Sequence, residues 1–94
     1  MLLYVAIEHE LSVLWPGTDF CWSQCAVLPC FHQYFHSTVT DMFVNGDHAV
    51  VRMADGSWQM CEVTWKTAND GVARTIPNSH RATLSEAVEA YKAS

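Results

Sequence analysis

The sequence predicts an α+β fold, an antiparallel β-meander of about four to five strands with a C-terminal helix packed on it. One or two short helices are expected after the first strand. The main signals are a helix-capping sequence near the end of the chain and three turn dipeptides, Asn45-Gly46, Asp55-Gly56 and Asp70-Gly71. With 94 residues, the chain is expected to form a single domain, residues 1–94, because this length leaves no room for a second core.

The first expected element is a strand over Leu2–Glu8, a short apolar segment that contains Val and Ile. The segment Leu11–Trp15 either extends this strand or forms a separate short element. A turn at Pro16-Gly17 follows it.

A helix is expected from about Asp19 to Leu28, because Thr18 or Asp19 can accept hydrogen bonds from the free amides at a helix start. Pro29 ends this helix. The same proline fits the first turn of a second short helix through about His36, where its missing N–H carries no penalty.

The central part of the sequence predicts four strands that are rich in Val, Thr and aromatic residues: Thr38–Val44, His48–Met53, Trp58–Thr67 and Val72–Ile76. In the third, apolar and polar residues alternate from Cys61 to Lys66, which is typical of a strand with one solvated face. Trp58 and Met60 fall out of this alternation, which predicts a bulge near Met60 or a partner contact there.

The last expected element is a helix that begins with the capping box Thr83-Leu84-Ser85-Glu86. It places apolar residues at i, i+3, i+4 and i+7, which is one narrow stripe along the helix: Leu84, Ala87, Val88 and Tyr91. We expect this stripe to pack on the meander.

The formal charge of −5 argues against direct nucleic-acid binding, because only five scattered Lys and Arg residues face ten carboxylates. Acidic side chains are better suited to a basic partner, and the carboxylates expected to meet it are Asp41, Asp47 and Asp55.

The apolar start of the chain is interrupted by Glu8, His9 and Glu10, too early for a signal peptide or a membrane span. A cytoplasmic protein without membrane contact is therefore expected. The four cysteines are then free thiols or metal ligands rather than disulfides.

The segment from Phe20 to Thr40 contains no Asp, Glu, Lys or Arg, yet it is rich in aromatic side chains. Such a segment must be buried all round, bound to a partner or organised by a ligand. The aromatic residues expected to bind a partner are Trp22, Phe31, Tyr34, Phe35 and Trp58. The alternative is that Trp15, Trp22 and Trp65 are core residues and only Trp58 is exposed.

Two further hypotheses use the same segment. A zinc ion could be held by two pairs of ligands with four-residue spacing: Cys21, Cys25, His32 and His36. Otherwise no cofactor is expected, and the cysteines and histidines pack as ordinary core or surface residues. The apolar segment could also join two copies of the chain in a homodimer.

No catalytic motif is present. The sequence has no Cys-X-X-Cys pair, no glycine-rich nucleophile turn and no phosphate-binding loop, so an enzyme is not expected. Binding is the better hypothesis.

The tail from Trp58 through Asp70-Gly71 to the helix Thr83–Tyr91 resembles the ending of many small phage and mobile-element proteins. In size, acidity and compact α+β build, the chain is similar to anti-CRISPR inhibitors. The resemblance implies a non-enzymatic protein that binds a host nucleoprotein complex in the host cytoplasm and blocks it sterically.

Overall fold

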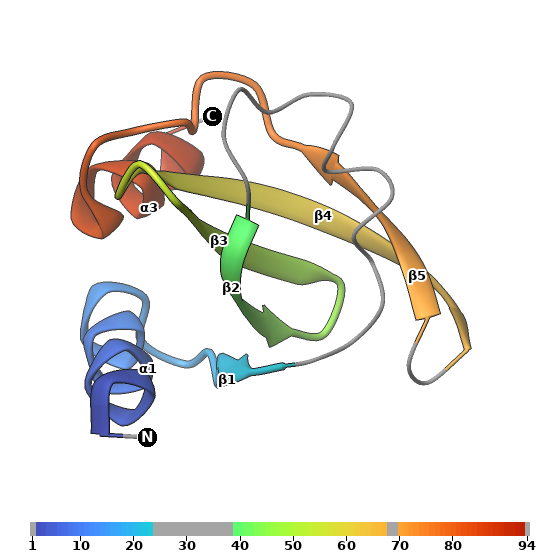
Figure 1. Ribbon diagram of the computed structural model, residues 1–94, viewed down its shortest axis with the longest axis horizontal. Helices are drawn as coiled ribbons and strands as arrows, with labels where there is room; N and C mark the ends of the chain where they lie inside the picture. The colour runs from blue at the N-terminus through green and yellow to red at the C-terminus, as the bar shows by residue number, and fades with distance from the viewer. Residues whose placement is uncertain (1, 24–38, 68–69, 94) are drawn as a thin grey trace.

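The computed structural model describes residues 2–23, 39–67 and 70–93, which contain a five-stranded antiparallel sheet and two helices (Figure 1). The α+β fold class is thus confirmed. The elements are α1 (Leu2–Leu14), β1 (Cys21–Trp22), β2 (Val39–Asn45), β3 (His48–Met53), β4 (Trp58–Thr67), β5 (Asp70–Thr75) and α3 (Leu84–Lys92).

The sheet has the strand order β1-β2-β3-β4-β5, so each strand pairs with its successor in the chain. Two of the three predicted turns join these strands as expected. Gly46 and Gly56 have φ values of 61° and 88°, a left-handed conformation that glycine adopts without strain.

The predicted turn at Asp70-Gly71 is wrong, because these two residues begin β5. Gly71 is needed there for a close approach between strands. A Cβ atom at this position would lie 2.8 Å from the backbone oxygen of Thr64. Residues 68 and 69, between β4 and β5, lie outside the described residues.

Strand β4 is buried on both faces over its first half, which explains why its apolar pattern does not alternate there. Trp58 and Met60 pack on one face of the sheet, and Cys61 and Val63 pack on the other. The pairing of Met60 with Val50 is regular, so the predicted bulge near Met60 is wrong. The register of β4 instead shifts between Trp65 and Thr67.

The predicted strand over Leu2–Glu8 is also wrong, because this segment and Leu11–Leu14 form the single helix α1. The residues that α1 turns toward the core follow a helical spacing of three and four: Tyr4, Ile7, Leu11 and Leu14. The valine and isoleucine content, which favours a strand, is overridden by this packing.

The predicted helix from Asp19 to Leu28 is wrong at its start, where Cys21 and Trp22 form β1 and pair with β2. Thr18, which was expected to cap this helix, makes a different contact: its hydroxyl donates a hydrogen bond of 2.6 Å to the carbonyl oxygen of Trp15. Residues 24–28 and the predicted helix Pro29–His36 lie outside the described residues.

The C-terminal helix is confirmed as α3, with Thr83 as its N-cap. The backbone N–H of Glu86 donates to the Thr83 hydroxyl oxygen over 3.2 Å, and that hydroxyl donates to Glu86 Oε1 over 2.8 Å. Leu84, Ala87 and Val88 are buried, as the stripe predicts, and Tyr91 is half-buried.

Both helices pack on the same face of the sheet, where they share one apolar cluster. This cluster contains Ile7 and Leu11 of α1, the three buried residues of α3, and Phe43, Val50 and Met60 of the strands. The opposite face has a second cluster: Met42, Ala49, Val51, Met53, Cys61, Val63 and Ala73.

The C-terminal ends of the two helices meet. Lys92 of α3 donates from Nζ to the carbonyl oxygen of Leu14 over 3.1 Å, and the rings of Trp15 and Tyr91 are 5.0 Å apart. The N-terminal part of α1 lies beside β1 and β2, since Tyr4 contacts Trp22 and Phe43. These contacts place both helices over the strands that carry the candidate site.

Candidate binding site

Five side chains from five different elements meet at one edge of the helix-covered face. We call them the Arg52 cluster: Tyr4, Trp22, Asp41, Arg52 and Trp58. The strand register creates its centre, because Arg52 on β3 lies directly opposite Asp41 on β2 and Trp58 on β4.

The guanidinium of Arg52 lies over the ring of Trp58, with its Cζ atom 4.9 Å from the ring centroid. This is a cation–π contact. Asp41 Oδ2 is 3.8 Å from Arg52 Nη1, an ion pair longer than the roughly 2.7–3.2 Å of a hydrogen bond. The Arg52 side chain is 24% exposed and that of Asp41 is 11% exposed, so the pair is accessible mainly through the arginine.

Tyr4 and Trp22 form a stacked pair beside this ion pair. Their ring centroids are 4.6 Å apart and their planes differ by 14°. Trp22 is held from the backbone as well, since its N–H donates to Glu8 Oε2 over 2.8 Å. A hydrogen bond to Asp41, together with burial, raises the pKa of Tyr4, so its hydroxyl stays protonated at neutral pH.

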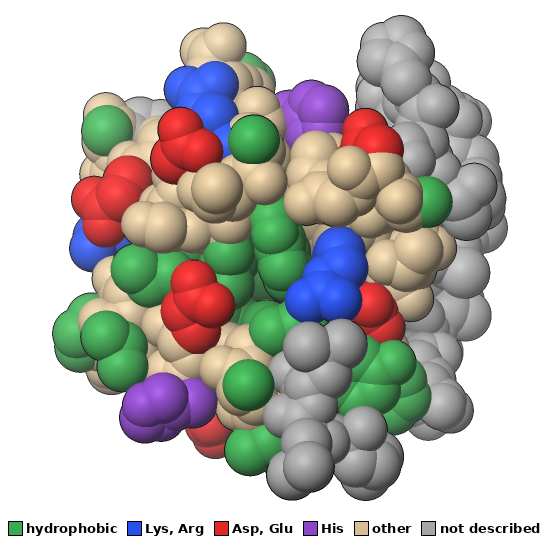
Figure 2. Space-filling model, turned by 60° about the vertical axis from the view of Figure 1, so that its left-hand side comes forward, with side chains coloured by type: hydrophobic (Ala, Val, Ile, Leu, Met, Phe, Trp, Pro, Cys, Tyr) green, Lys and Arg blue, Asp and Glu red, His purple; other side chains and the backbone are tan. Residues whose placement is uncertain are grey.

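Figure 2, which brings the left-hand side of Figure 1 forward, shows a hollow between the region of α3 above and that of α1 below. Hydrophobic side chains form its floor, and basic and acidic side chains stand at its rim. Arg52 and Trp58 belong to the strand face beneath these helices, because they share the side of the sheet occupied by Val50 and Met60.

The structure brings together three of the residues predicted to bind a partner, Trp22, Asp41 and Trp58. Trp58, however, is only 8% exposed, so the expectation that it is the exposed tryptophan is wrong. It supports the cluster from below, while Trp22 is half-buried and accessible.

The other predicted residues lie elsewhere. Asp47 is at the β2–β3 turn, and Asp55 is at the β3–β4 turn, where it accepts hydrogen bonds from the Ser57 N–H and hydroxyl. Phe31, Tyr34 and Phe35 lie outside the described residues.

Sequence reasoning missed Tyr4 and Arg52, the two residues that complete the cluster. Arg52 was one of five scattered cations, and its position opposite Trp58 depends on strand register. Recognition of α1 as a helix would have placed Tyr4 on its inner side, together with Ile7 and Leu11.

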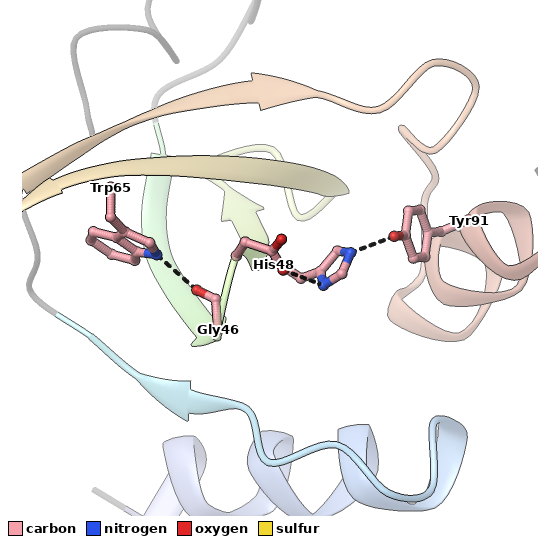
Figure 3. Close-up of polar contacts among 5 residues, drawn as sticks. Gly46, His48, Trp65 and Tyr91 are labelled. Carbon is pink, nitrogen blue, oxygen red and sulfur yellow. Dashed lines mark hydrogen bonds and ion pairs between the residues drawn. The ribbon is translucent and has the colours of Figure 1, made fainter.

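A second polar group consists of Asp47, His48 and Tyr91 and connects the start of β3 to α3. Figure 3 shows His48 and Tyr91 turned toward each other. The Tyr91 hydroxyl is 2.5 Å from His48 Nε2, and Asp47 Oδ1 is 3.2 Å from His48 Nδ1. Trp15 packs against both rings, at 5.8 Å from that of His48. In the same view, Trp65 Nε1 donates to the carbonyl oxygen of Gly46 over 2.8 Å, which fixes the β2–β3 turn.

The arrangement of Asp47, His48 and Tyr91 resembles a catalytic nucleophile beside its general base. The electrostatic environment of Tyr91, however, favours a structural role. Burial raises the pKa of Tyr91, and the carboxylates of Glu62 and Asp47 raise it further. The phenol therefore remains neutral at neutral pH, and its hydroxyl is hydrogen-bonded to His48 Nε2. The group holds α3 to β3 beside the end of α1.

Of the four predicted zinc ligands, only Cys21 lies within the described residues, where it is exposed. Burial, followed by the charges of Asp19 and Glu8, raises the pKa of its thiol. Cys25, His32 and His36 lie outside the described residues, so the zinc hypothesis stays a prediction. Within residues 2–23, 39–67 and 70–93, no group of three or more His, Cys, Asp or Glu side chains could hold a metal ion.

Cys61 has the opposite environment to a reactive cysteine. It is fully buried in the second apolar cluster, and this burial raises the pKa of its thiol to about 12. Since the thiolate is the nucleophile, Cys61 is inert in the folded protein at neutral pH.

No family model, curated protein or solved structure matches the chain. Neither α1 nor α3, the helices of the described ranges, is long and apolar enough to cross a membrane.

Proposed function

We propose that this protein is a non-enzymatic binding module that holds a protein partner at the Arg52 cluster. One observation carries the proposal: the guanidinium of Arg52 is fixed on Trp58, partly exposed, and 3.8 Å from its carboxylate neighbour. That spacing leaves N–H groups of the guanidinium able to donate to acceptors on another molecule.

The composition of the cluster supports protein binding. Tyr, Trp and Arg are the residue types that dominate the energetics of protein interfaces. Here Tyr4 and Trp22 hold each other by stacking, and Arg52 is held on Trp58. Side chains that are already ordered lose less conformational entropy when a partner binds.

The cluster also defines the chemistry of the partner surface. Arg52 suits a carboxylate or a pair of carbonyl oxygens, which its planar N–H groups can bind side by side. Tyr4 and Trp22 suit an apolar side chain placed next to that acceptor. The acidic net charge of the protein favours Lys and Arg around this central contact.

Catalysis has less support than binding. In the described part of the chain, burial and neighbouring carboxylates keep Tyr91 protonated, and burial keeps Cys61 protonated. These raised pKa values disfavour Tyr91 and Cys61 as nucleophiles.

Within the class of binding modules, we place the protein among small inhibitors that block a host nucleoprotein complex sterically. The resemblance in size, acidity and architecture to anti-CRISPR proteins supports this proposal. The α+β fold and the lack of a dense basic surface are compatible with it. Contact with the protein component of the complex would then be made through Arg52 and the Tyr4–Trp22 pair.

The test is affinity capture from a lysate of the host cell, followed by titration of the captured protein. Arg52→Gln removes the charge and the planar N–H fork. Arg74→Gln is the matched control, because it removes the same charge from an exposed residue of β5. We expect the wild type and the control to bind alike, and Arg52→Gln to bind at least ~10-fold more weakly.

Equal affinity of the two variants, or capture of no protein by the wild type, would contradict the proposal. Circular dichroism of each variant checks that the fold is retained. Inhibition of the captured complex by the wild type, lost in Arg52→Gln, tests the proposed inhibitory role separately from binding.

A further inference from the structure

A second arginine, Arg81, lies in the same row of side chains as Arg52 and Trp58. The connection from β5 to α3 passes beside the start of β4, where Arg81 and Trp58 form an isolated antiparallel bridge (Figure 1). Each of the two residues donates its backbone N–H to the carbonyl oxygen of the other, over 2.8 and 2.9 Å. Directly paired residues place their side chains on the same face of a sheet, so Arg81 lies on the face that carries Trp58.

The same two hydrogen bonds determine the spacing of the row. Because the N–H and the carbonyl of Trp58 both point to Arg81, Trp58 and Arg52 form a non-hydrogen-bonded pair. The Cα atoms of such a pair are about 4.5 Å apart, against about 5.5 Å in a hydrogen-bonded pair. The row Arg52–Trp58–Arg81 therefore places the Cα atoms of the two arginines about 10 Å apart, with the indole between them.

The side chain of Arg81 is exposed, and it has no acidic partner in the described part of the chain. All ten Asp and Glu residues lie in residues 2–23, 39–67 and 70–93, and none of the ion pairs formed there includes Arg81. Asp70 pairs with Thr67, at the other end of β4 from Trp58. An acidic side chain for Arg81 would therefore have to come from another molecule.

Arg52 is only partly neutralised. Its carboxylate neighbour, Asp41, is 3.8 Å away, longer than the roughly 2.7–2.9 Å of a charge-assisted hydrogen bond. Two of the three arginines of an acidic protein thus lie on one face, on either side of one indole, without a close carboxylate. Arginine is the residue type best suited to bind carboxylates through paired N–H groups.

Two observations favour carboxylates of a protein over phosphates of a nucleic acid. Trp58 is 8% exposed, so it offers no open ring face on which a base could stack. Asp41 beside Arg52, together with the net charge of −5, repels a continuous phosphate backbone. Two separate acidic side chains contact the two arginines without bringing further negative charge to this surface.

We propose that Arg52 and Arg81 together bind two acidic side chains of the protein partner, one on each side of Trp58. This inference rests on the proposed function and adds the chemistry of the partner, an extended segment with Glu or Asp at alternate positions. Side chains at i and i+2 of an extended segment lie on the same side, about 7 Å apart. The long arginine and glutamate side chains span the difference from the arginine spacing of about 10 Å.

A synthetic pentapeptide with blocked ends, Gly-Glu-Leu-Glu-Gly, is the probe for this site. Its binding is followed by NMR titration of the isotope-labelled protein in about 0.1 M salt, which screens long-range charge effects. We expect a dissociation constant of about 1 mM, with shifts of the amide signals of Arg52, Trp58 and Arg81. The same peptide with Gln in place of both Glu residues should not bind at up to about 10 mM. Because the protein and the probe are both negatively charged, non-specific attraction cannot produce this binding.

Three single variants assign the binding to the two arginines. Arg52→Gln and Arg81→Gln should each bind the probe at least ~3-fold more weakly than the wild type, because each removes one of the two contacts. Arg74→Gln is the matched control, since it removes the same charge from a residue that lies opposite Glu62, and it should bind like the wild type. The bridge between Arg81 and Trp58 uses backbone atoms only, and circular dichroism checks that each variant keeps its fold.

Three outcomes would overturn the inference: no binding of the probe by the wild type up to about 10 mM, signal shifts confined to other regions, or equal affinity of Arg81→Gln and Arg74→Gln. The proposed function fails by a different result, equal binding of the captured protein by Arg52→Gln and Arg74→Gln. A captured protein that is weakened by Arg52→Gln but not by Arg81→Gln would remove the second contact and leave the proposed function in place.

Discussion

Arg52, on β3, contacts both neighbouring strands at once. Its side chain lies on Trp58 of β4 and beside Asp41 of β2, and its carbonyl oxygen accepts a hydrogen bond of 3.2 Å from the hydroxyl of Thr40. An arginine so constrained presents its remaining N–H groups in a fixed direction. This restriction distinguishes Arg52 from a freely rotating surface cation, and it is the reason for the proposed role of Arg52 in recognition.

Cys61 is the residue whose environment makes a direct prediction about pH. Its thiol has a pKa of about 12 in the folded protein, against 9.0 for an unperturbed thiol. Above pH 9 the thiol ionises in the unfolded chain but not in the folded one. Stability from this residue is therefore present below pH 9 and is lost between pH 9 and 12, by up to about 1.4 kcal/mol per pH unit.

Cys61→Ala should remove this contribution. The free energy of unfolding of each protein is measured with urea at pH 7.5 and again at pH 10. We expect the decrease between these two pH values to be about 1.4 kcal/mol smaller in the variant than in the wild type. Groups such as Tyr4 and Tyr91, whose pKa values are also raised, affect both proteins equally. The same loss in both proteins would show that Cys61 is not responsible.

At the scale of elements, the close approach of β4 and β5 at Gly71 depends on the absence of a side chain. Gly71→Ala would place a Cβ atom 2.8 Å from the Thr64 oxygen and 3.0 Å from Val63 Cγ1. The backbone oxygen cannot rotate away, so the strands must separate. We expect a loss of about 1–3 kcal/mol in the free energy of unfolding.

Chemical unfolding measures this loss. Gly56→Ala is a useful comparison, because its Cβ would meet no atom within 4 Å and only the φ of 88° would be strained. The two variants separate steric from conformational cost. A Gly71→Ala protein as stable as the wild type would mean that β4 and β5 are less closely paired than described.

Elements defined by local signals were predictable from the sequence. The three strands β2, β3 and β4 and helix α3 lie within one or two residues of their expected bounds, because turn glycines and the Thr83 capping box act over a few residues. Helix α1 was not predictable from the sequence, because its Val and Ile content favours a strand and only tertiary packing selects the helix.

The candidate site was predictable only in part, for a physical reason. Trp22, Asp41 and Trp58 were identified by residue type, but their contact depends on the register of four strands. Tyr4 and Arg52 could be assigned to the site only from the structure, which places α1 and β3 beside the strands that carry Trp22, Asp41 and Trp58. A site assembled from five elements leaves no local pattern in the sequence.

At the scale of the whole molecule, Tyr91 and His48 connect parts of the chain that are 43 residues apart, and Trp15 packs on both. Tyr91→Phe keeps the ring and removes only the hydroxyl. We expect a loss of about 0.5–1.5 kcal/mol in the free energy of unfolding. Hydrogen exchange should become faster in the C-terminal turns of both α1 and α3.

Ser85→Ala, on the exposed side of α3, serves as the control and should stay within about 0.5 kcal/mol of the wild type. Faster exchange in α3 with no change in α1 would contradict the idea that this contact joins the two helices. Loss of exchange protection at the end of α1 would support it.

The sequential strand order also determines how the chain reaches this structure. From β2 to β5, pairing of each strand with its successor closes only short loops, so these hairpins can form quickly and locally. The contact of Lys92 with Leu14 spans 78 residues and has to wait for both helices. We therefore expect the contact between the C-terminal ends of α1 and α3 to form late in folding, and a chain still being synthesised cannot make this contact until the last turn of α3 has emerged.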